Sequence, residues 1–226
     1  MLCAVCGGAE FKAKPVLWPR LIDQWQLSPA EAAYVDRQQG ECCTTCGANL
    51  RSIALAKALR AVVGTSLTLQ DFVNSDEASK LRVLELNEAG TLNPILSRMN
   101  GHVFGAYPQV DMHALPWPAE TFDIVIHSDT LEHVPDPIHA LAECRRVLRP
   151  TGSLCLTVPI IVGRMSRGRA GLPKSYHGDP QESGDDYMVH TEFGADAWCF
   201  LLEAGYTDVS IVPIAYPAAL AMAARR

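Results

Sequence analysis

One stretch, residues 111–159, constrains the fold of this chain more than any other. It contains two short apolar runs, Phe122–His127 and Leu154–Val158, separated by a segment with helical periodicity that opens on Asp136 and a proline. Continuous apolar runs of this length favour strands buried on both faces, and an acid followed by proline is typical of a helix start. Two strands joined by a helix lie parallel in one sheet. The stretch therefore predicts a β-α-β unit within an α/β fold.

The same stretch also contains a series of short motifs. It reads ALPWPAETFDIVIHSDTLEHVPDP and, further on, LAECRRVLRPTGSLCLTVP. Together these segments, which span about 50 residues, resemble the central part of class I S-adenosylmethionine (SAM) dependent methyltransferases of the type 11 kind. The resemblance implies a Rossmann-like sheet with helices on both faces, SAM as cofactor, and transfer of its methyl group to an acceptor.

The resemblance and the cysteine pattern together suggest three parts. We expect a zinc-knuckle module at residues 1–50, a helical linker at 51–80 and a methyltransferase-like domain at 81–226. In the first part, the S-P-A-E segment at Ser28 is a capping box and predicts a short helix. In the second, residues 51–63 predict a helix that Gly64 ends. Arg51 is either a substrate contact or a surface or capping residue.

The N-terminal part contains two C-x-x-C-G knuckles, formed by Cys3 with Cys6 and by Cys43 with Cys46. Four thiolates at this spacing suit tetrahedral Zn²⁺. The alternatives are reduced core cysteines or a redox pair, and Cys42 could replace Cys43 as a ligand. Four cysteines complete a zinc coordination shell, so the site is expected to be structural.

The cofactor residues are implied by the resemblance. The family's first strand, matched here by residues 81–86, leads into a loop with three glycine positions, which Asn87, Ala89 and Thr91 occupy in this chain; the only glycine, Gly90, is displaced by one. The second strand, residues 102–107, lacks the family's terminal acid, and one helix-strand unit after it is trimmed. The resemblance implies that Asp111 contacts the adenine of SAM, and the alternative is that Asp111 is a turn residue. Residues expected near SAM are Glu85, Leu86, Asn87, Gly90, Tyr107, Asp111, Met112, His127 and Ser128.

Three histidines are candidates for a general base, because imidazole titrates near neutral pH. His133 belongs to the L-E-H motif, and His177 and His190 belong to or follow a long loop after Pro159 that is expected to cover the acceptor. The alternatives are a loop-stabilising role for His133, which we also expect for Glu132, and ordinary surface histidines for the other two.

Near the C-terminus, residues 193–204 have an amphipathic helical pattern that ends at Gly205, and residues 207–214 predict a strand. In the family, the last two strands form an antiparallel hairpin. The tail from residue 216 is alanine-rich and makes a poor strand, so we expect it to be helical or frayed.

Composition limits the partners. The chain has a net charge of −6 and a sequence pI of about 5.6, and no run of Lys and Arg supplies a basic face. This disfavours nucleic acid and favours a small-molecule acceptor. No long apolar stretch or signal peptide is evident, so a cytoplasmic protein without a membrane span is expected.

Two alternative functions stay open, a scaffold that has lost SAM binding and a zinc-bearing RNA methyltransferase. A nicotinamide dehydrogenase is disfavoured because G-x-G-x-x-G is absent. Oligomeric state is left open.

Overall fold

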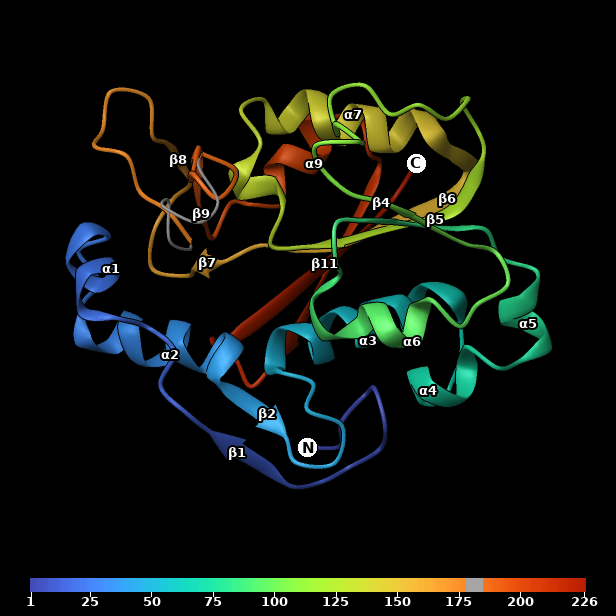
Figure 1. Cartoon of the computed structure of the whole chain (residues 1–226), viewed down its shortest axis with the longest axis horizontal. Helices are drawn as coiled ribbons and strands as arrows, with labels where there is room; N and C mark the ends of the chain where they lie inside the picture. Colours follow the sequence, from blue (N-terminus) through green and yellow to red (C-terminus); the bar gives the residue numbers. More distant parts are fainter. Residues whose placement is uncertain (178–184) are drawn as a thin grey trace.

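The computed structural model describes residues 1–177 and 185–226. Its centre is a six-stranded sheet in the order β10-β11-β6-β5-β3-β4 (Figure 1). The strands of this sheet are β3 (Val83–Leu86), β4 (His102–Gly105), β5 (Phe122–Ser128), β6 (Leu148–Thr157), β10 (Asp208–Ile214) and β11 (Ala219–Arg225). The first four are parallel, and β11 is antiparallel to both of its neighbours. The predicted α/β class with a Rossmann-like sheet is confirmed.

The β-α-β unit forms where the sequence predicts it. Helix α7 (Pro137–Val147) begins after Asp136, whose side chain accepts a hydrogen bond from the His139 backbone at 3.0 Å. Strands β5 and β6 on either side of α7 are parallel, with Val125 opposite Leu154. The strand after α7 begins at Leu148, earlier than the apolar run alone indicates.

Helices cover both faces of the sheet. Helices α7 and α9 (Cys199–Glu203) lie on one face, and α3 (Leu50–Val63) and α6 (Asn93–Leu96) lie on the other (Figure 1). Helix α3 begins at the Asn49 cap and ends at Gly64, whose φ of 69° is left-handed. It packs along β6, β10 and β11, so this part of the predicted linker is one layer of the main fold. The domain boundaries themselves stay a prediction.

The N-terminal part lies beside the end of the sheet where β7 (Ile160–Ile161) follows β6 (Figure 1). It contains β1 (Phe11–Ala13), α1 (Pro19–Gln24), α2 (Pro29–Gly40) and β2 (Glu41–Cys43). Both halves of the predicted capping box at Ser28 are present. The remaining short helices are α4 (Leu69–Phe72), α5 (Asp76–Ser79), η1 (Gly90–Leu92) and η2 (Leu131–His133).

The helix predicted at residues 193–204 is wrong in its first half. Residues Thr191–Gly194 form strand β9, which pairs with β7 (Ile160–Ile161) and β8 (Arg167–Gly168), and the helix begins only at Cys199. A Cβ on Gly194 would lie 2.2 Å from the Arg164 carbonyl oxygen. The backbone at Gly194 therefore passes very close to the backbone at Arg164. Gly194 belongs to the extended strand β9, although the sequence pattern had indicated a helix.

The expectation for the C-terminal tail is also wrong. Residues Ala219–Arg225 form β11, which lies between β10 and β6, with Met222 opposite Leu156. Pairing on both sides satisfies the backbone of this alanine-rich strand, and the small side chains let α3 pack close to it. Strands β10 and β11 thus form an antiparallel hairpin, which the alanine-rich tail did not predict.

Two further expectations concern loops. The long segment after Pro159 contains β7 and β8, and its residues 178–184 lie outside the described part. In the described chain, β4 is the edge strand of the sheet, which agrees with a trimmed helix-strand unit. A bilayer-spanning helix is absent from the described residues.

Candidate active site

The loop after β3 turns sharply at the carboxyl end of that strand. Asn87 and Gly90 have φ angles of 52° and 57°, both in the left-handed region. A Cβ on Gly90 would lie 2.8 Å from Ser52 Oγ and 3.6 Å from Ser128 Oγ. Asn87 Oδ1 also accepts a hydrogen bond from the Tyr107 backbone at 3.0 Å, which joins this loop to the end of β4. Asparagine thus supplies the left-handed conformation that a glycine would otherwise provide.

Glu85 is fully buried and stabilises the same loop. Its Oε1 accepts a hydrogen bond from the Ala89 backbone at 2.7 Å, and its Oε2 lies 2.6 Å from His102 Nε2 and 3.1 Å from Asn93 Nδ2. Its carboxylate therefore has protein partners on both oxygens. Leu86, the next residue, is part of the apolar core.

The residues expected near adenosine differ in their access. Tyr107 is exposed, whereas Met112 is buried in the core. Asp111 is exposed and accepts a hydrogen bond from the His113 backbone at 2.8 Å, which lowers the pKa of Asp111. Tyr107 and Asp111 are thus accessible from solvent, whereas Met112 belongs to the apolar core.

His127 and Ser128 end strand β5 and point to opposite faces of the sheet. Ser128 Oγ lies 2.7 Å from Thr157 Oγ1, next to the loop after β3. His127 is fully buried, and among the described residues neither ring nitrogen has a hydrogen-bond partner. Burial lowers the pKa of His127 to about 4, so the ring is neutral near pH 7.

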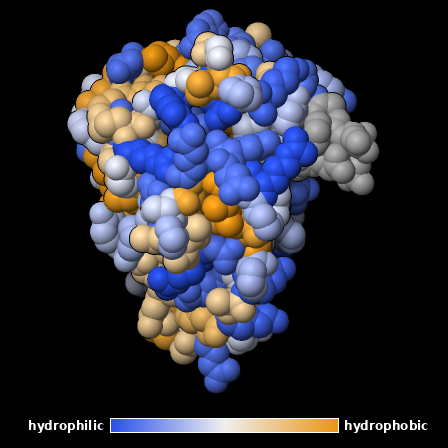
Figure 2. Space-filling model, turned by 90° about the vertical axis from the view of Figure 1, so that its left-hand side faces the viewer, coloured by the Kyte–Doolittle hydropathy of each residue, from blue (hydrophilic) through white to orange (hydrophobic). Residues whose placement is uncertain are grey.

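A cavity of about 280 Å³ lies beyond the carboxyl ends of β5 and β6. Its lining combines apolar side chains of the N-terminal part with polar ones of the main fold. The lining residues are Val16, Leu17, Trp18, Leu21, Trp25, Leu27, Val35, Gln39, Arg51, Asp129, His133, Pro159, His177 and Tyr187. Figure 2 shows the corresponding side of the molecule, where apolar side chains gather near the centre within polar surroundings. Such a mixed lining is typical of small-molecule sites.

One wall of the cavity contains two imidazoles around a buried carboxylate. Glu132 Oε1 lies 3.7 Å from His133 Nε2 and 3.6 Å from His177 Nδ1. The rings of the two histidines are 5.1 Å apart and nearly perpendicular. Burial alone would raise the pKa of Glu132, but the neighbouring imidazoles of His133 and His177 hold it below its usual value.

A second wall contains a buried ion pair. Arg51 from α3 contacts Asp129, which follows β5 with a φ of 51°. Gln38 Oε1 accepts a hydrogen bond from Arg51 at 2.9 Å, and Gln39 Nε2 donates one to Asp129 at 3.1 Å. Helix α2 of the N-terminal part therefore helps to fix both charges of the main fold.

His190 is placed differently from the other two candidate bases. Its backbone N–H donates to the Glu132 carbonyl at 2.7 Å, but its side chain is not part of the cavity lining. Burial lowers the pKa of His190. The structure therefore brings His133 and His177 together at the cavity and leaves His190 beside it.

The four predicted zinc ligands gather at one point. The thiol sulfurs of Cys3, Cys6, Cys43 and Cys46 all lie within 4.8 Å of one another, and the Cys3–Cys46 and Cys6–Cys43 distances are each 3.7 Å. Tetrahedral zinc with Zn–S bonds of about 2.3 Å requires S–S edges of ~3.8 Å. The donor set thus fits zinc. Cys42 lies outside the cluster, with its thiol directed at the Gln39 and Gly40 carbonyls.

Burial and backbone donors act against each other at these thiols. Burial raises the pKa of Cys3 to about 11. At Cys43 burial is outweighed by the backbone N–H groups of Cys46 and Thr45, and the pKa falls to about 7. A metal that binds all four sulfurs as thiolates would release the remaining protons.

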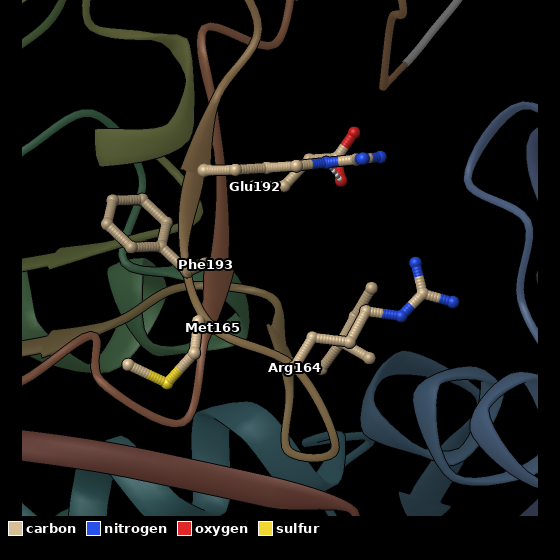
Figure 3. A pocket seen from close by; sticks show the side chains of 6 residues that line it. Arg164, Met165, Glu192 and Phe193 are labelled. Carbon is tan, nitrogen blue, oxygen red and sulfur yellow. Dashed lines mark hydrogen bonds and ion pairs between the residues drawn. The ribbon is translucent and has the colours of Figure 1, made fainter.

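A smaller cavity of about 210 Å³ lies between β9 and the β7–β8 connection, where Arg164, Met165, Glu192 and Phe193 meet (Figure 3). Its charged groups are paired within the protein. Arg164 Nε donates to Glu31 of α2 at 2.7 Å, and Arg167 Nε donates to Glu192 at 2.7 Å. This cavity therefore marks the junction between α2 and the small sheet.

Comparison with known proteins identifies the sequence family. The family described as "Methyltransferase domain" matches residues 44–156, half of the chain. A probable S-adenosylmethionine-dependent methyltransferase of Mycobacterium tuberculosis (strain ATCC 25618 / H37Rv) is 30% identical over 115 residues, which cover 49% of this chain and 38% of the relative. The ubiquinone biosynthesis O-methyltransferase of Histophilus somni (strain 2336) is 26% identical over 136 residues, or 57% of this chain and 51% of the relative. The chain thus spans about half or less of the length of these relatives.

Solved structures of methyltransferases are also similar to this fold. The citrinin polyketide synthase CMeT domain has a TM-score of 0.47 at 15% identity and covers 88% of this chain and 57% of its own. The trans-methyltransferase CalH, in complex with SAH, has a TM-score of 0.40 at 16% identity, covering 76% and 64%.

Part of the site could not be found from the sequence. Glu132 lies at the centre of the imidazole pair, although its L-E-H motif indicated only a structural role. Trp25 and Tyr187 contact the imidazoles, with ring centroids 5.1 Å from His177 and 5.9 Å from His133, respectively. No sequence pattern indicated either contact.

Proposed function

The chain belongs to the methyltransferase domain family, and on this premise we propose that it is a SAM-dependent methyltransferase with a small-molecule acceptor. The observation that carries the proposal is the loop after β3, where Asn87 and Gly90 adopt left-handed angles at the carboxyl end of the sheet. In open parallel sheets this edge is where ligands bind. The same edge borders the 280 Å³ cavity through Asp129 and Pro159.

The residues of this edge fit SAM as follows. The backbone of Asn87–Gly90 would hold the methionine part, with Glu85 and Leu86 supporting it and Ser128 beside it. Tyr107 would approach the ribose. SAM supplies an activated methyl group on a sulfonium when bound. Asp111 and Met112 would lie near the adenine, and the neutral, buried His127 would support the end of β5 beneath the cofactor.

The cavity would hold the acceptor next to the cofactor loop. Its apolar and aromatic lining suits a small organic molecule, and the net charge of −6 disfavours a nucleic acid. His133 Nδ1–H donates to the Met188 carbonyl at 3.1 Å, and its Nε2 lies 3.7 Å from Glu132 Oε1. His133 and His177 are therefore the candidates for orienting or deprotonating the acceptor, with His190 as a supporting residue.

The four-cysteine cluster is proposed to bind a structural Zn²⁺. Its sulfur distances match a tetrahedral site, and four thiolates leave no position for water or substrate. The zinc would hold β2 and the first knuckle against α3, since Cys43 and Val5 are both in the same core cluster as Leu50.

The test of the proposed function is calorimetric titration of zinc-loaded protein with S-adenosylhomocysteine (SAH). Wild type should bind with a micromolar Kd. Gly90→Ala should weaken binding at least tenfold, because the added Cβ meets Ser52 Oγ and the φ of 57° is unfavourable for alanine. Gly64→Ala is the matched control, with a φ of 69° and open space around its Cβ. Absence of SAM and SAH binding by wild type would contradict the proposal.

A further inference from the structure

Among the described residues, the buried carboxylate of Glu132 has no hydrogen-bond partner. Its side chain is 1% exposed, and within residues 1–177 and 185–226 neither oxygen accepts a hydrogen bond. Buried carboxylates are costly unless they are paired or bind a metal. Glu132 lies on the short helix η2, whose turn places its side chain beside the cavity wall. The described part of the protein thus contains a charged group that its side chains do not satisfy.

The two imidazoles near Glu132 are too far away for hydrogen bonds but close enough to share an ion with it. The three ligand atoms, Glu132 Oε1, His133 Nε2 and His177 Nδ1, all lie within 4.8 Å of one another. Distances of 3.6 and 3.7 Å from the carboxylate exceed those of hydrogen bonds. Metal–ligand bonds of about 2.0–2.2 Å place ligand atoms ~3–4.4 Å apart. The cluster needs only small shifts to meet this requirement.

Other contacts of the protein fix the positions of His133 and His177. The hydrogen bond from His133 Nδ1 to the Met188 carbonyl orients the ring so that Nε2 lies 3.7 Å from Glu132 Oε1. Such a bond from the second ring nitrogen is common in histidines that bind metals. The His177 backbone donates to the Tyr187 carbonyl at 3.0 Å, and its ring packs against Trp25. Both donors are therefore positioned in advance.

The charges around the cluster favour a cation. Arg51 is paired with Asp129, so its charge is engaged away from Glu132. A divalent cation would satisfy the charge of Glu132 and bind both imidazoles. The competing explanation is a protonated imidazole paired with Glu132, which would bind no metal.

We propose that Glu132, His133 and His177 bind one first-row divalent cation. Two histidines and one carboxylate leave further coordination positions, which would face the cavity because both imidazoles line it. We infer, on the basis of the proposed function, that these positions bind an oxygen of the acceptor, such as a hydroxyl. Coordination would release the hydroxyl proton to solvent. The oxygen electron pair would then form the bond to the methyl carbon, and the C–S pair would stay on sulfur to give SAH.

The test uses zinc-loaded full-length protein titrated with Mn²⁺ and followed by electron paramagnetic resonance. Mn²⁺ prefers oxygen and imidazole ligands and competes poorly with zinc for thiolates. Wild type should remove one equivalent of Mn²⁺ from solution. Glu132→Gln and His177→Asn should each weaken this binding at least tenfold. His139→Asn, which changes a histidine of α7 outside the cluster, should leave it unchanged.

Equal Mn²⁺ binding by wild type and both variants, or no binding by wild type, would overturn the proposal. If the variants do not fold, Co²⁺ absorption of the zinc-loaded wild type decides. Weak d–d bands without a thiolate charge-transfer band support the Glu-His-His site, whereas thiolate bands alone contradict it. SAH titration of the same samples separates the two proposals. If the wild type binds SAH but no Mn²⁺, only the proposed metal site is overturned. If it binds Mn²⁺ but no SAH, only the proposed function is overturned.

Discussion

The indole N–H of Trp25 donates a buried hydrogen bond to Ser175 Oγ at 2.8 Å, across 150 residues of sequence. Trp25 follows helix α1 of the N-terminal part, and Ser175 lies in the segment after β8. The same indole packs against His177. The N-terminal part therefore forms a wall of the candidate active site as well as a possible zinc module.

This relationship predicts that Trp25→Phe lowers the free energy of unfolding by about 2 kcal/mol. The change removes a buried hydrogen bond and leaves a small void in the packing. Urea unfolding followed by circular dichroism would measure it. Trp18→Phe is the control, because Trp18 is 41% exposed and its replacement should cost less than about 0.5 kcal/mol. Equal effects of the two changes would contradict this role of Trp25.

Zinc content should depend on Cys43 and be independent of Cys42. Cys43→Ser removes one sulfur of the four-cysteine cluster, whereas the Cys42 thiol lies outside it. We expect one zinc per chain in wild type and Cys42→Ser, and well below one in Cys43→Ser, by plasma emission spectrometry. Chelation of wild-type zinc should also destabilise the N-terminal part, because metal binding stabilises small modules of this kind. Zinc loss in Cys42→Ser with retention in Cys43→Ser would reverse the ligand assignment.

The ion pair of Glu31 and Arg164 should make stability depend on pH. The hydrogen bond from Arg164 lowers the pKa of Glu31 from 4.5 to about 2. A carboxyl group with a depressed pKa in the folded state contributes stability above its unfolded pKa, and this contribution falls as the pH drops from 4.5 toward 2. Glu31→Gln should thus cost about 1–2 kcal/mol at pH 7 and progressively less below pH ~4.5.

Thermal or urea unfolding between pH 7 and pH 3 would measure the difference between wild type and Glu31→Gln. Glu203→Gln on α9 is a suitable control, since Glu203 is exposed and has no ion pair among the described residues. A Glu31→Gln difference that stays constant over this pH range would contradict the paired state of Glu31.

Arg51 and Asp129 should show strong energetic coupling. Arg51→Met leaves Asp129 and the Gln38 side-chain oxygen without their cationic partner, at a cost of about 3–5 kcal/mol. Because Asp129→Asn removes the same pair from the other side, the double variant should be more stable than the sum of the single changes implies. Urea unfolding of all four proteins gives the coupling energy, and additive effects would show that the pair is not formed.

Apolar periodicity and helix-capping residues in the sequence predicted those elements whose structure depends on neighbouring residues in the chain. The β5-α7-β6 unit and the caps at Ser28 and Gly64 follow from apolar periodicity and from residues that satisfy helix ends. Strand β11 did not follow from such patterns, because alanine favours helices and only its two neighbouring strands make the extended form stable. Phe193 and Gly194 were misassigned to a helix for a related reason, since the strand that they belong to depends on contacts with β7 and β8.

The same limit applies to the candidate site. His133 and His177 could be selected by residue type, but their convergence on Glu132 depends on the path of the segment after β8. The Cys cluster could be predicted better, because the knuckle spacing itself selects Cys43 over Cys42. The pairing of Arg51 with Asp129 required the packing of α3 on the sheet, and no sequence spacing indicated it.

The most direct measurement of the central claim is a crystal structure of the zinc-loaded protein grown with SAH. We expect SAH density along the loop Asn87–Gly90, with adenosine toward Tyr107 and Asp111 and the sulfur directed at the cavity that His133 and His177 line. Well-ordered crystals at saturating SAH without density at this loop, or with SAH bound at another surface, would contradict it.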